Sequence, residues 1–294
     1  MPMETFSASG KLMLFGEYLV LSGSLSLAIP LKWGQTLSVE KYDHFLWEGY
    51  EKGNQWFSLS LDQDLNIQQT NNQEAANILV KLLTVIRDKN PGINLQQKYR
   101  TEANFTLAWG IGSSSTLISL LTQWSNVDWR TLLESTFKGS GYDVACATAN
   151  APLLFSINGI NEEVKLNSTV TDQLLFVYSG KKQSSRDEIQ KFNQHEVSRE
   201  VVDNMNTIIN KAIKANSIEE FEIQMNDSED LLSNVLKRET IGTEYFSDYP
   251  FSTKSLGAWG GDFFMASYRK LKDAKTYFEN KGFTTSYTYK ELIK

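Results

Sequence analysis

The segment Gly110–Ser115, with the sequence Gly-Ile-Gly-Ser-Ser-Ser, constrains the fold of this 294-residue chain more than any other stretch. Two glycines permit a tight turn, and three hydroxyl residues then open a segment whose apolar positions recur every three or four residues. These positions are Leu117, Ile118, Leu120, Leu121 and Trp124. Such a loop directs free N–H groups and the positive end of a helix dipole at one point, which suits phosphate. An ordinary capped helix remains the alternative interpretation.

Composition and charge narrow the class of protein. A net charge of −6 argues against a nucleic-acid partner, which would need a basic face. One cysteine, Cys146, and two separated histidines, His44 and His195, argue against a disulfide framework and a His/Cys metal site. No apolar run approaches the roughly 18 residues of a membrane span, and the stretch 12–21 lacks a basic leader. We therefore expect a soluble, cytoplasmic protein without a membrane partner.

The hydrophobic pattern predicts a mixed α/β chain with two domains. The expected helices cover residues 74–87, 117–124, 128–137, 187–216 and 218–237. The expected strands cover residues 11–20 with an interruption at 16–18, 25–39, 45–61 with turns at 48–49 and 52–54, 95–107, 153–157, 174–178, 263–268 and 283–289. A polar stretch between 158 and 172 separates two short apolar strands. Placing the boundary there gives an N-terminal domain over 1–168 and a C-terminal domain over 169–294.

Three further stretches carry residues that invite a chemical reason. Lys11 and Glu17 interrupt an apolar run near the start, where buried charge is costly unless it is paired. An edge strand facing water is the usual alternative. Asp143 follows the turn Gly-Ser-Gly and is either a helix N-cap or a carboxylate held as a base. The paired glycines Gly260 and Gly261 make a turn or allow the backbone to approach a ligand.

The order of these stretches resembles that of the GHMP small-molecule kinases, and the phosphomevalonate kinases are nearest. The shared motifs are Gly-Lys with Gly-Glu-Tyr, Gly-Ile-Gly-Ser-Ser-Ser, Gly-Ser-Gly-Tyr-Asp-Val-Ala and Gly-Ala-Trp-Gly-Gly-Asp. The resemblance covers nearly the whole chain. It implies a fold with an N-terminal domain like domain 2 of ribosomal protein S5 and a C-terminal ferredoxin-like domain. It also implies an ATP-dependent kinase that uses Mg²⁺.

The resemblance assigns roles to residues of these motifs. The loop residues that would wrap the ATP triphosphate are Gly110, Gly112, Ser113, Ser114 and Ser115. Ser114 and Glu134 would hold Mg²⁺. Asp143 would lie beside the acceptor oxygen, and Lys11 would pair with it. A hydroxyl acceptor needs such a carboxylate to take its proton, whereas a phosphate acceptor does not.

Substrate contacts are expected in three separate stretches of the chain. Their residues are Glu17, Lys181, Lys182, Ser185, Arg186, Gly260 and Gly261. The basic turn 179–186 resembles a family turn at a helix start and suits an anionic substrate, although a solvated basic turn is the alternative.

Two tryptophans depart from the family pattern. Trp109 precedes the loop where a small residue is usual, and Trp259 replaces a glycine of the last motif. Each ring either narrows the space beside the phosphates, stacks on a ligand, or packs the protein interior. The sequence thus favours a kinase of a small anionic metabolite, with mevalonate or phosphomevalonate first, acting as a monomer or homodimer. A diphosphomevalonate decarboxylase-like lyase and a non-catalytic ligand-binding protein of the same fold are the alternatives.

Overall fold

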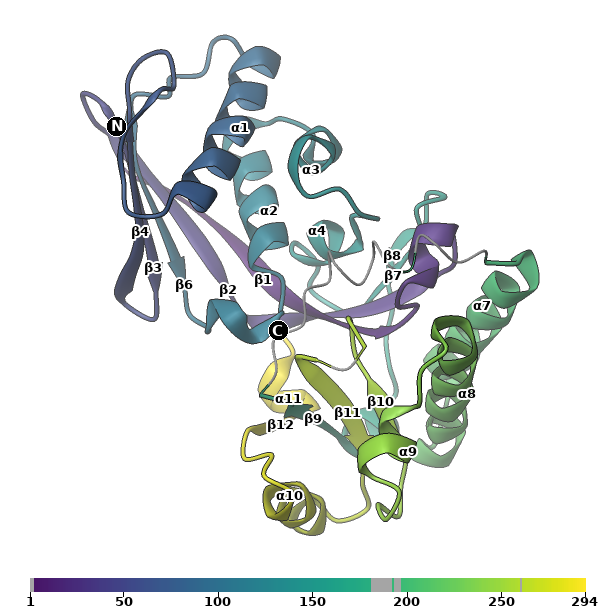
Figure 1. The fold of residues 1–294 in the computed structure, drawn as a ribbon. Coiled ribbons are helices and arrows are strands. Elements are labelled where there is room, and N and C mark those ends of the chain that lie inside the picture. Colours follow the sequence, from purple (N-terminus) through teal and green to yellow (C-terminus); the bar gives the residue numbers. More distant parts are fainter. Residues whose placement is uncertain (1–2, 181–191, 193–196, 260) are drawn as a thin grey trace. The chain divides into compact units, whose positions relative to one another are not determined.

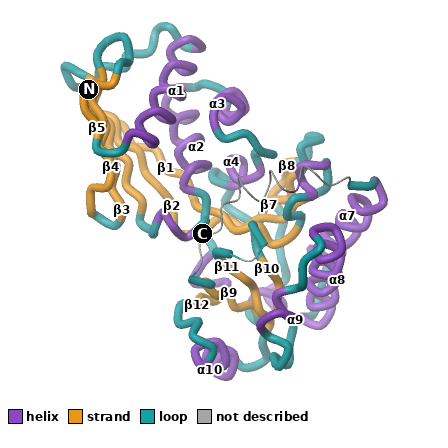
Figure 2. The backbone as a smooth tube through the Cα atoms, viewed as in Figure 1, coloured by secondary structure: helices purple, strands orange, loops and turns teal. Residues whose placement is uncertain are grey.

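The computed structural model describes residues 3–180, 192, 197–259 and 261–294 and confirms the mixed α/β class (Figures 1 and 2). The chain forms two compact units, and neither is continuous in sequence. The first unit holds residues up to Gly10, Trp33–Leu107 and Gly112–Thr148; the second holds Lys11–Lys32, Ala108–Ile111 and Ala149–Lys294. A single boundary at residue 168 therefore does not reproduce the grouping, because two early segments pack with the later part of the chain.

The first unit is built on a twisted sheet. Its strands follow the order β5 (Ile67–Thr70), β4 (Asn54–Leu61), β3 (Phe45–Glu51), β6 (Gln97–Ala103) and β2 (Ser26–Lys41), and β1 (Glu4–Phe15) also pairs with β2. Strand β3 runs parallel to β6, and the pairings β2–β6, β3–β4 and β4–β5 are antiparallel. In Figure 1 the helices α1 (Gln73–Lys89), α2 (Ser113–Ser125) and α3 (Trp129–Thr136) cover one face of this sheet. Their apolar sides and the facing strand residues form one buried core.

Local sequence explains where these elements begin and end. Helix α1 starts after Asn72, whose side chain accepts a hydrogen bond from Ala75 N at 3.1 Å, and it ends before Pro91. The strand expected from residue 11 begins earlier, at Glu4, and it ends at the expected interruption, so residues 16–20 do not continue it. Strand β1 stops at Phe15 because Gly16 turns the chain with φ 94°, and a Cβ there would overlap the backbone of Leu25. A 3₁₀ turn, η1 (Leu19–Ser22), follows.

The second unit contains its own antiparallel sheet in the order β10 (Thr253–Ser255), β11 (Phe263–Ser267), β9 (Leu174–Tyr178) and β12 (Ser286–Thr288). In the larger sheet, which contains β2, strand β7 (Leu153–Phe155) pairs with the first half of β2, and β8 (Asn161–Glu163) pairs with β7. Helices α7 (Arg199–Lys214) and α8 (Ile218–Leu236) lie side by side. Among the residues that the structure describes, this unit also contains α5 (Ser168–Thr171), α9 (Ile241–Tyr245), α10 (Leu271–Asn280) and α11 (Tyr289–Leu292).

Helix α7 begins later than expected. Ser198 is its N-cap and accepts a hydrogen bond from Val201 N at 3.4 Å, so the helix starts at Arg199. Most of the earlier part of the expected helix, residues 187–191 and 193–196, lies outside the described residues. Across the described segments, no helix combines the length and apolar character needed to cross a bilayer.

Candidate functional site

The Gly/Ser loop leads directly into α2, a 13-residue helix of the first unit. Gly112 is the N-cap of α2 with φ 98°, and as a glycine it offers no side chain to the free N–H groups of the first turn. Ser115 turns its hydroxyl back to Gly112 O at 2.8 Å and is buried. Ser113 is half-buried and Ser114 is exposed. Two hydroxyls and the N–H groups of this turn therefore remain for an anion.

A cavity of about 170 Å³ lies beside this helix start, within the first unit. Ser113 and Ser114 form part of its wall. The aromatic side chains that line it are Trp47, Trp56, Phe57 and Phe137. Aromatic walls next to a phosphate-type turn suit a flat ring that carries phosphates.

The two acidic residues expected in catalysis also lie in the first unit. Glu134 is exposed on α3. Asp143 is half-buried in the first turn of α4 (Tyr142–Cys146), and its Oδ1 accepts a hydrogen bond from Val144 N at 3.0 Å. The N-cap alternative for Asp143 is wrong because Gly141 occupies that position with φ 83°. A Cβ on Gly141 would overlap the Trp129 ring, so this turn is packed tightly on α3.

Strand β1 connects the segments around the loop. Ser9 N donates to Ala147 O, at the end of α4, at 2.8 Å. Two residues later, Lys11 N donates to Ile111 O, inside the Gly/Ser segment, at 2.8 Å. Lys11 itself is only 9% exposed. The alternative that Lys11 faces water from an edge strand is therefore wrong.

In the second unit, Gly110 packs directly against the last glycine motif. Its φ is 68°, and a Cβ there would overlap the carboxylate of Asp262. Asp262 is buried, has φ 47°, and its carbonyl oxygen accepts a hydrogen bond from Ser179 N at 2.7 Å. Strained backbone of this kind is common at functional sites. The start of the loop and the start of the 179–186 segment thus meet at one aspartate.

The two unusual tryptophans pack within the second unit. Trp259 is buried, and its backbone N–H donates to the Tyr18 hydroxyl at 3.1 Å. The Trp259 indole Nε1 has no hydrogen-bond partner among the described residues. Trp109 contacts Tyr178, with ring centroids 5.7 Å apart, and lies edge-on to Phe263 at 6.2 Å. Packing is the role that the structure gives Trp109.

A cluster of buried charged side chains connects the Gly-Glu-Tyr turn at residues 16–18 with the stretch 254–263. Lys254 Nζ contacts Glu17 Oε1 at 2.6 Å, and the two side chains are 0% and 1% exposed. Lys254 also donates to Ser255 O at 3.0 Å. Glu229 on α8 accepts a hydrogen bond from Ser255 N at 3.0 Å. Glu17 therefore does not face water, and its Oε2 lacks a hydrogen-bond partner among the described residues.

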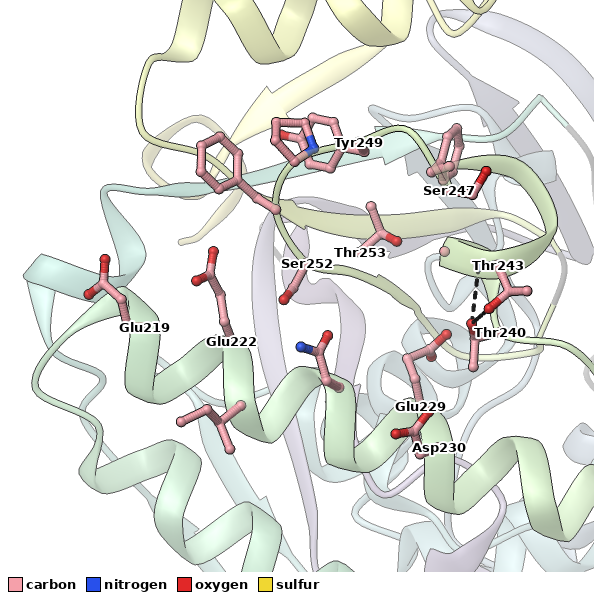
Figure 3. Close-up of a pocket in the computed structure, with 16 residues that line it drawn as sticks. Glu219, Glu222, Glu229, Asp230, Thr240, Thr243, Ser247, Tyr249, Ser252 and Thr253 are labelled. Carbon is pink, nitrogen blue, oxygen red and sulfur yellow. Dashed lines mark hydrogen bonds between the residues drawn. The ribbon is translucent and has the colours of Figure 1, made fainter.

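Glu229 also forms the inner end of an acidic cavity of about 790 Å³ in the second unit. Figure 3 shows Glu222, Glu229 and Asp230 along α8, opposite the hydroxyl residues of the 240–253 segment. Burial raises the pKa of Glu229 to about 7, neighbouring Glu17 adds to the rise, and Lys254 opposes it. Burial also raises the pKa of Glu17.

This raised pKa predicts how stability depends on pH. Between the ordinary value of 4.5 and about 7, folded Glu229 holds a proton that the unfolded chain releases. The free energy of unfolding should therefore fall by on the order of 3 kcal/mol as pH rises through this window, relative to Glu229→Gln. Urea titrations of both proteins at pH 4.5, 6 and 8 measure the difference. Asp230→Asn, an exposed acid of the same cavity, should keep the wild-type slope; equal slopes for wild type and Glu229→Gln would contradict the assignment.

Several expected substrate residues cannot be placed. Lys181, Lys182, Ser185, Arg186 and Gly260 lie outside the described residues. Gly261 is described, and its N–H donates to Ala258 O at 3.3 Å. The sequence analysis did not single out Lys254, Asp262 or Glu229, which the structure brings into the buried contacts described above. The first two stand in the quoted stretch 254–263, but no local pattern marks Glu229.

The chemistry of the loop residues fits Mg²⁺. The hydroxyl of Ser114 and the carboxylate of Glu134 are oxygen ligands of the kind that Mg²⁺ prefers, and phosphate oxygens usually complete its coordination. Within the described segments, no group of three or more His, Cys, Asp or Glu side chains forms a site that holds a metal by itself.

The fold of this chain resembles those of solved structures over nearly its whole length. The Methanococcus jannaschii mevalonate kinase aligns with 17% identity and a TM-score of 0.70, over 97% of this chain and 97% of that chain. A Streptococcus pneumoniae phosphomevalonate kinase in complex with phosphomevalonate and AMPPNP aligns with 18% identity and a TM-score of 0.70, over 98% and 100%. The chain has the GHMP kinase fold.

A mevalonate pyrophosphate decarboxylase from Streptococcus pyogenes aligns less well, with 12% identity and a TM-score of 0.57, over 100% of this chain and 97% of that chain. No sequence-family model matches the chain, and no curated protein sequence matches it. At these identities the likeness concerns the GHMP kinase fold and leaves the reaction to be argued from the residues.

Proposed function

We propose that the chain is an ATP-dependent kinase that transfers the γ-phosphate to a small anionic metabolite, with mevalonate and phosphomevalonate as the first candidates. One observation carries this proposal. The Gly/Ser segment begins at Gly110, packed on Asp262 of the last glycine motif, and ends at Gly112 as the uncapped start of α2. The last glycine motif therefore packs on the first residue of a phosphate-type loop.

The nucleotide is assigned to the first unit. The triphosphate would take the N–H groups and the Ser113 and Ser114 hydroxyls at the start of α2. The base would enter the aromatic cavity beside them. When bound with ATP, Mg²⁺ would neutralise charge on the transferring phosphate, with Ser114 and Glu134 as its protein ligands. The phosphomevalonate kinase of the same fold, whose structure contains AMPPNP, supports this choice of nucleotide.

The acceptor chemistry is assigned to Asp143 and Lys11. Asp143 would take the proton of a hydroxyl acceptor as its oxygen attacks phosphorus. Lys11 would offset the negative charge that develops on the transferring group. Hydrogen bonds hold the β1 backbone at Ala147, just after α4, and at Ile111 in the loop. This arrangement supports a common function for the two residues.

The substrate end is assigned to the turn after β1. Glu17 remains a proposed substrate contact through the turn that it forms, although its side chain is 1% exposed and its Oε2 is buried without a hydrogen-bond partner in the described part of the chain. Lys181, Lys182, Ser185, Arg186, Gly260 and Gly261 remain proposed substrate contacts.

The decarboxylase alternative shares the nucleotide site and differs in its product. Incubating the protein with Mg·ATP and, in turn, mevalonate, phosphomevalonate and diphosphomevalonate separates the cases. ADP release that depends on one of the first two supports the kinase. Release of CO₂ from diphosphomevalonate would support the lyase, and binding of ATP without turnover of any acceptor would support a non-catalytic protein.

The nucleotide site predicts a specific loss of binding. Ser114→Ala and Glu134→Gln should each weaken Mg·ATP binding or turnover by on the order of tenfold or more, because each removes a proposed oxygen ligand. Titration calorimetry with Mg·AMPPNP and initial rates with Mg·ATP measure the two effects.

Matched changes elsewhere in the first unit provide the controls. Ser135→Ala removes a hydroxyl of α3 that donates to Leu132 O at 2.8 Å, and Glu74→Gln removes an exposed acid of α1. Both should bind Mg·AMPPNP as the wild type does. Unchanged affinity and turnover in both Ser114→Ala and Glu134→Gln would refute the assignment of the metal and phosphate ligands.

A further inference from the structure

The acidic cavity of the second unit has the size of a small-molecule site, and the proposed kinase reaction does not use it. Its volume of about 790 Å³ lies within the range of roughly 300–1,000 Å³ that is typical of ligand pockets. One wall is α8 and the other is the segment 240–253, so the lining belongs to a single unit (Figure 3). Among the described residues that line it, four are acidic and none is a lysine, arginine or histidine. This lining favours a ligand that carries positive charge.

Arg269 shows how one end of this cavity binds a cation. Its guanidinium donates two hydrogen bonds to the Glu222 carboxylate, both at 2.9 Å, and contacts Glu219 at 2.9 Å. The same group lies over the Phe251 ring, 4.8 Å from the ring centre. Carboxylates and an aromatic face together are a favourable environment for an organic cation. At this end of the cavity the chain itself supplies that cation.

The other end of the cavity carries two acids without such a partner. Glu229 and Asp230 lie about 10 Å further along the axis of α8 than Glu222, because an α-helix rises about 1.5 Å per residue. Among the described residues, neither carboxylate forms an ion pair with a lysine or arginine. Lys254 opposes the rise in the pKa of Glu229, but its ion pair is with Glu17, at 2.6 Å. This end therefore has an excess of acidic groups.

The facing wall at this end supplies further groups that suit an ammonium. Ile241 N donates to Glu229 Oε2 at 3.4 Å, which holds the start of α9 close to this carboxylate. Thr240 and Thr243 lie on the same side of the cavity in Figure 3 and offer hydroxyl oxygens. Phe246, which follows α9, also lines the cavity. An ammonium can donate to carboxylate and hydroxyl oxygens together while its alkyl part packs on an aromatic ring.

The buried carboxyl group at this end would change its charge when a cation binds. Glu229 is 3% exposed, and burial raises its pKa to about 7, with Glu17 adding to the rise. A cation beside it favours the ionised form and lowers this pKa, so binding slightly below neutral pH releases a proton. A metal ion fits less well, because in the described segments no three acidic, histidine or cysteine side chains converge on one point.

We propose that this end of the cavity binds the ammonium group of a small aliphatic amine, with Asp230 and Glu229 as its counter-charges. Exposed Asp230 would contact the ammonium from the open side, and Glu229 would face it from the inner end of the cavity. The site lies wholly within the second unit. It does not depend on the proposed kinase activity, so either proposal can fail without the other.

Calorimetry with putrescine tests this site in the full chain. At about pH 6.5, in two buffers of different ionisation enthalpy, the wild type should bind putrescine saturably and release about half a proton or more per amine bound. Asp230→Asn and Glu229→Gln should each weaken binding about tenfold or more, and Glu229→Gln should abolish the proton release. Asp273→Asn, which removes an exposed acid of α10 outside the cavity, should bind as the wild type does. Butanediol, which lacks the charges, should not bind.

A second variant keeps the test independent of the buried carboxyl group. Asn226 is exposed, lines the cavity and lies one turn before Asp230 on α8, so Asn226→Lys supplies an internal ammonium and should abolish putrescine binding. A wild-type protein without saturable binding refutes the proposal. Equal affinity in the wild type, Asp230→Asn and Glu229→Gln indicates general attraction to an acidic protein and also refutes it. Binding of Mg²⁺ that is tighter than that of putrescine and is lost in the same variants would assign this end to a metal ion instead.

Discussion

Lys254→Met is expected to lower the free energy of unfolding by about 3–5 kcal/mol, because it removes the cation of a buried ion pair and leaves its partner without compensation. The Lys254 ammonium is fully buried and lies 2.6 Å from Glu17 Oε1 and 5.3 Å from the centre of the Phe15 ring. Methionine fills a similar volume, so the loss of charge dominates over a cavity. Urea unfolding with an unchanged slope measures the effect.

Two further variants identify the origin of this loss. Glu17→Gln combined with Lys254→Met removes both charges and should recover a large part of the stability. Lys281→Met breaks an exposed pair with Asp248, 2.7 Å apart, and should change stability little. If Lys254→Met unfolds like Lys281→Met, the buried pair does not stabilise the turn after β1.

The helices of the fold are largely predictable from sequence because their signals are local. Helix α1 has an Asn72 cap, apolar residues at helical spacing and Pro91 just beyond its end. Helix α8 was expected over 218–237 and spans Ile218–Leu236, with Ser217 as its N-cap. Each of these signals involves residues that are close together in the sequence, so the sequence alone is enough to recognise the helix.

The buried charge cluster could not be predicted in the same way. Glu17 and Lys254 are 237 residues apart, and each alone suggests an exposed side chain. Glu229 lies on an amphipathic helix rich in acids, where nothing local separates it from exposed Asp230. Only the packing of α8 on β10 buries Glu229 and brings it to Ser255 N. Tertiary contacts, which the sequence does not display, determine these positions.

The candidate loop is an intermediate case. Its glycines and serines marked Gly110–Ser115 as a phosphate-type turn, and the structure places Gly112 at the helix start with φ 98°. The sequence could not distinguish among the three hydroxyls. Ser115 turns inward to Gly112 O, whereas Ser114 is exposed, so the single-residue assignment depends on side-chain geometry.

Asp143→Asn is expected to keep the fold and the affinity for Mg·AMPPNP and to lose turnover, and the size of the loss identifies the acceptor. A hydroxyl acceptor must lose its proton during transfer, and a positioned general base contributes roughly 10²–10⁴-fold to such a step. A phosphate acceptor arrives ionised, so the substitution would remove only charge ordering around it. Steady-state rates with each accepted substrate compare the variant with wild type.

The size of the loss separates the two cases. With a hydroxyl acceptor, turnover by Asp143→Asn should fall by an amount within that range. With a phosphate acceptor, the loss should be small. Asp128→Asn, which removes an exposed acid that caps α3 through Arg130 N, controls for a general loss of acidic charge in the first unit. Full activity of Asp143→Asn on every accepted substrate would make this carboxylate structural, because its bond to Val144 N would then be its only role.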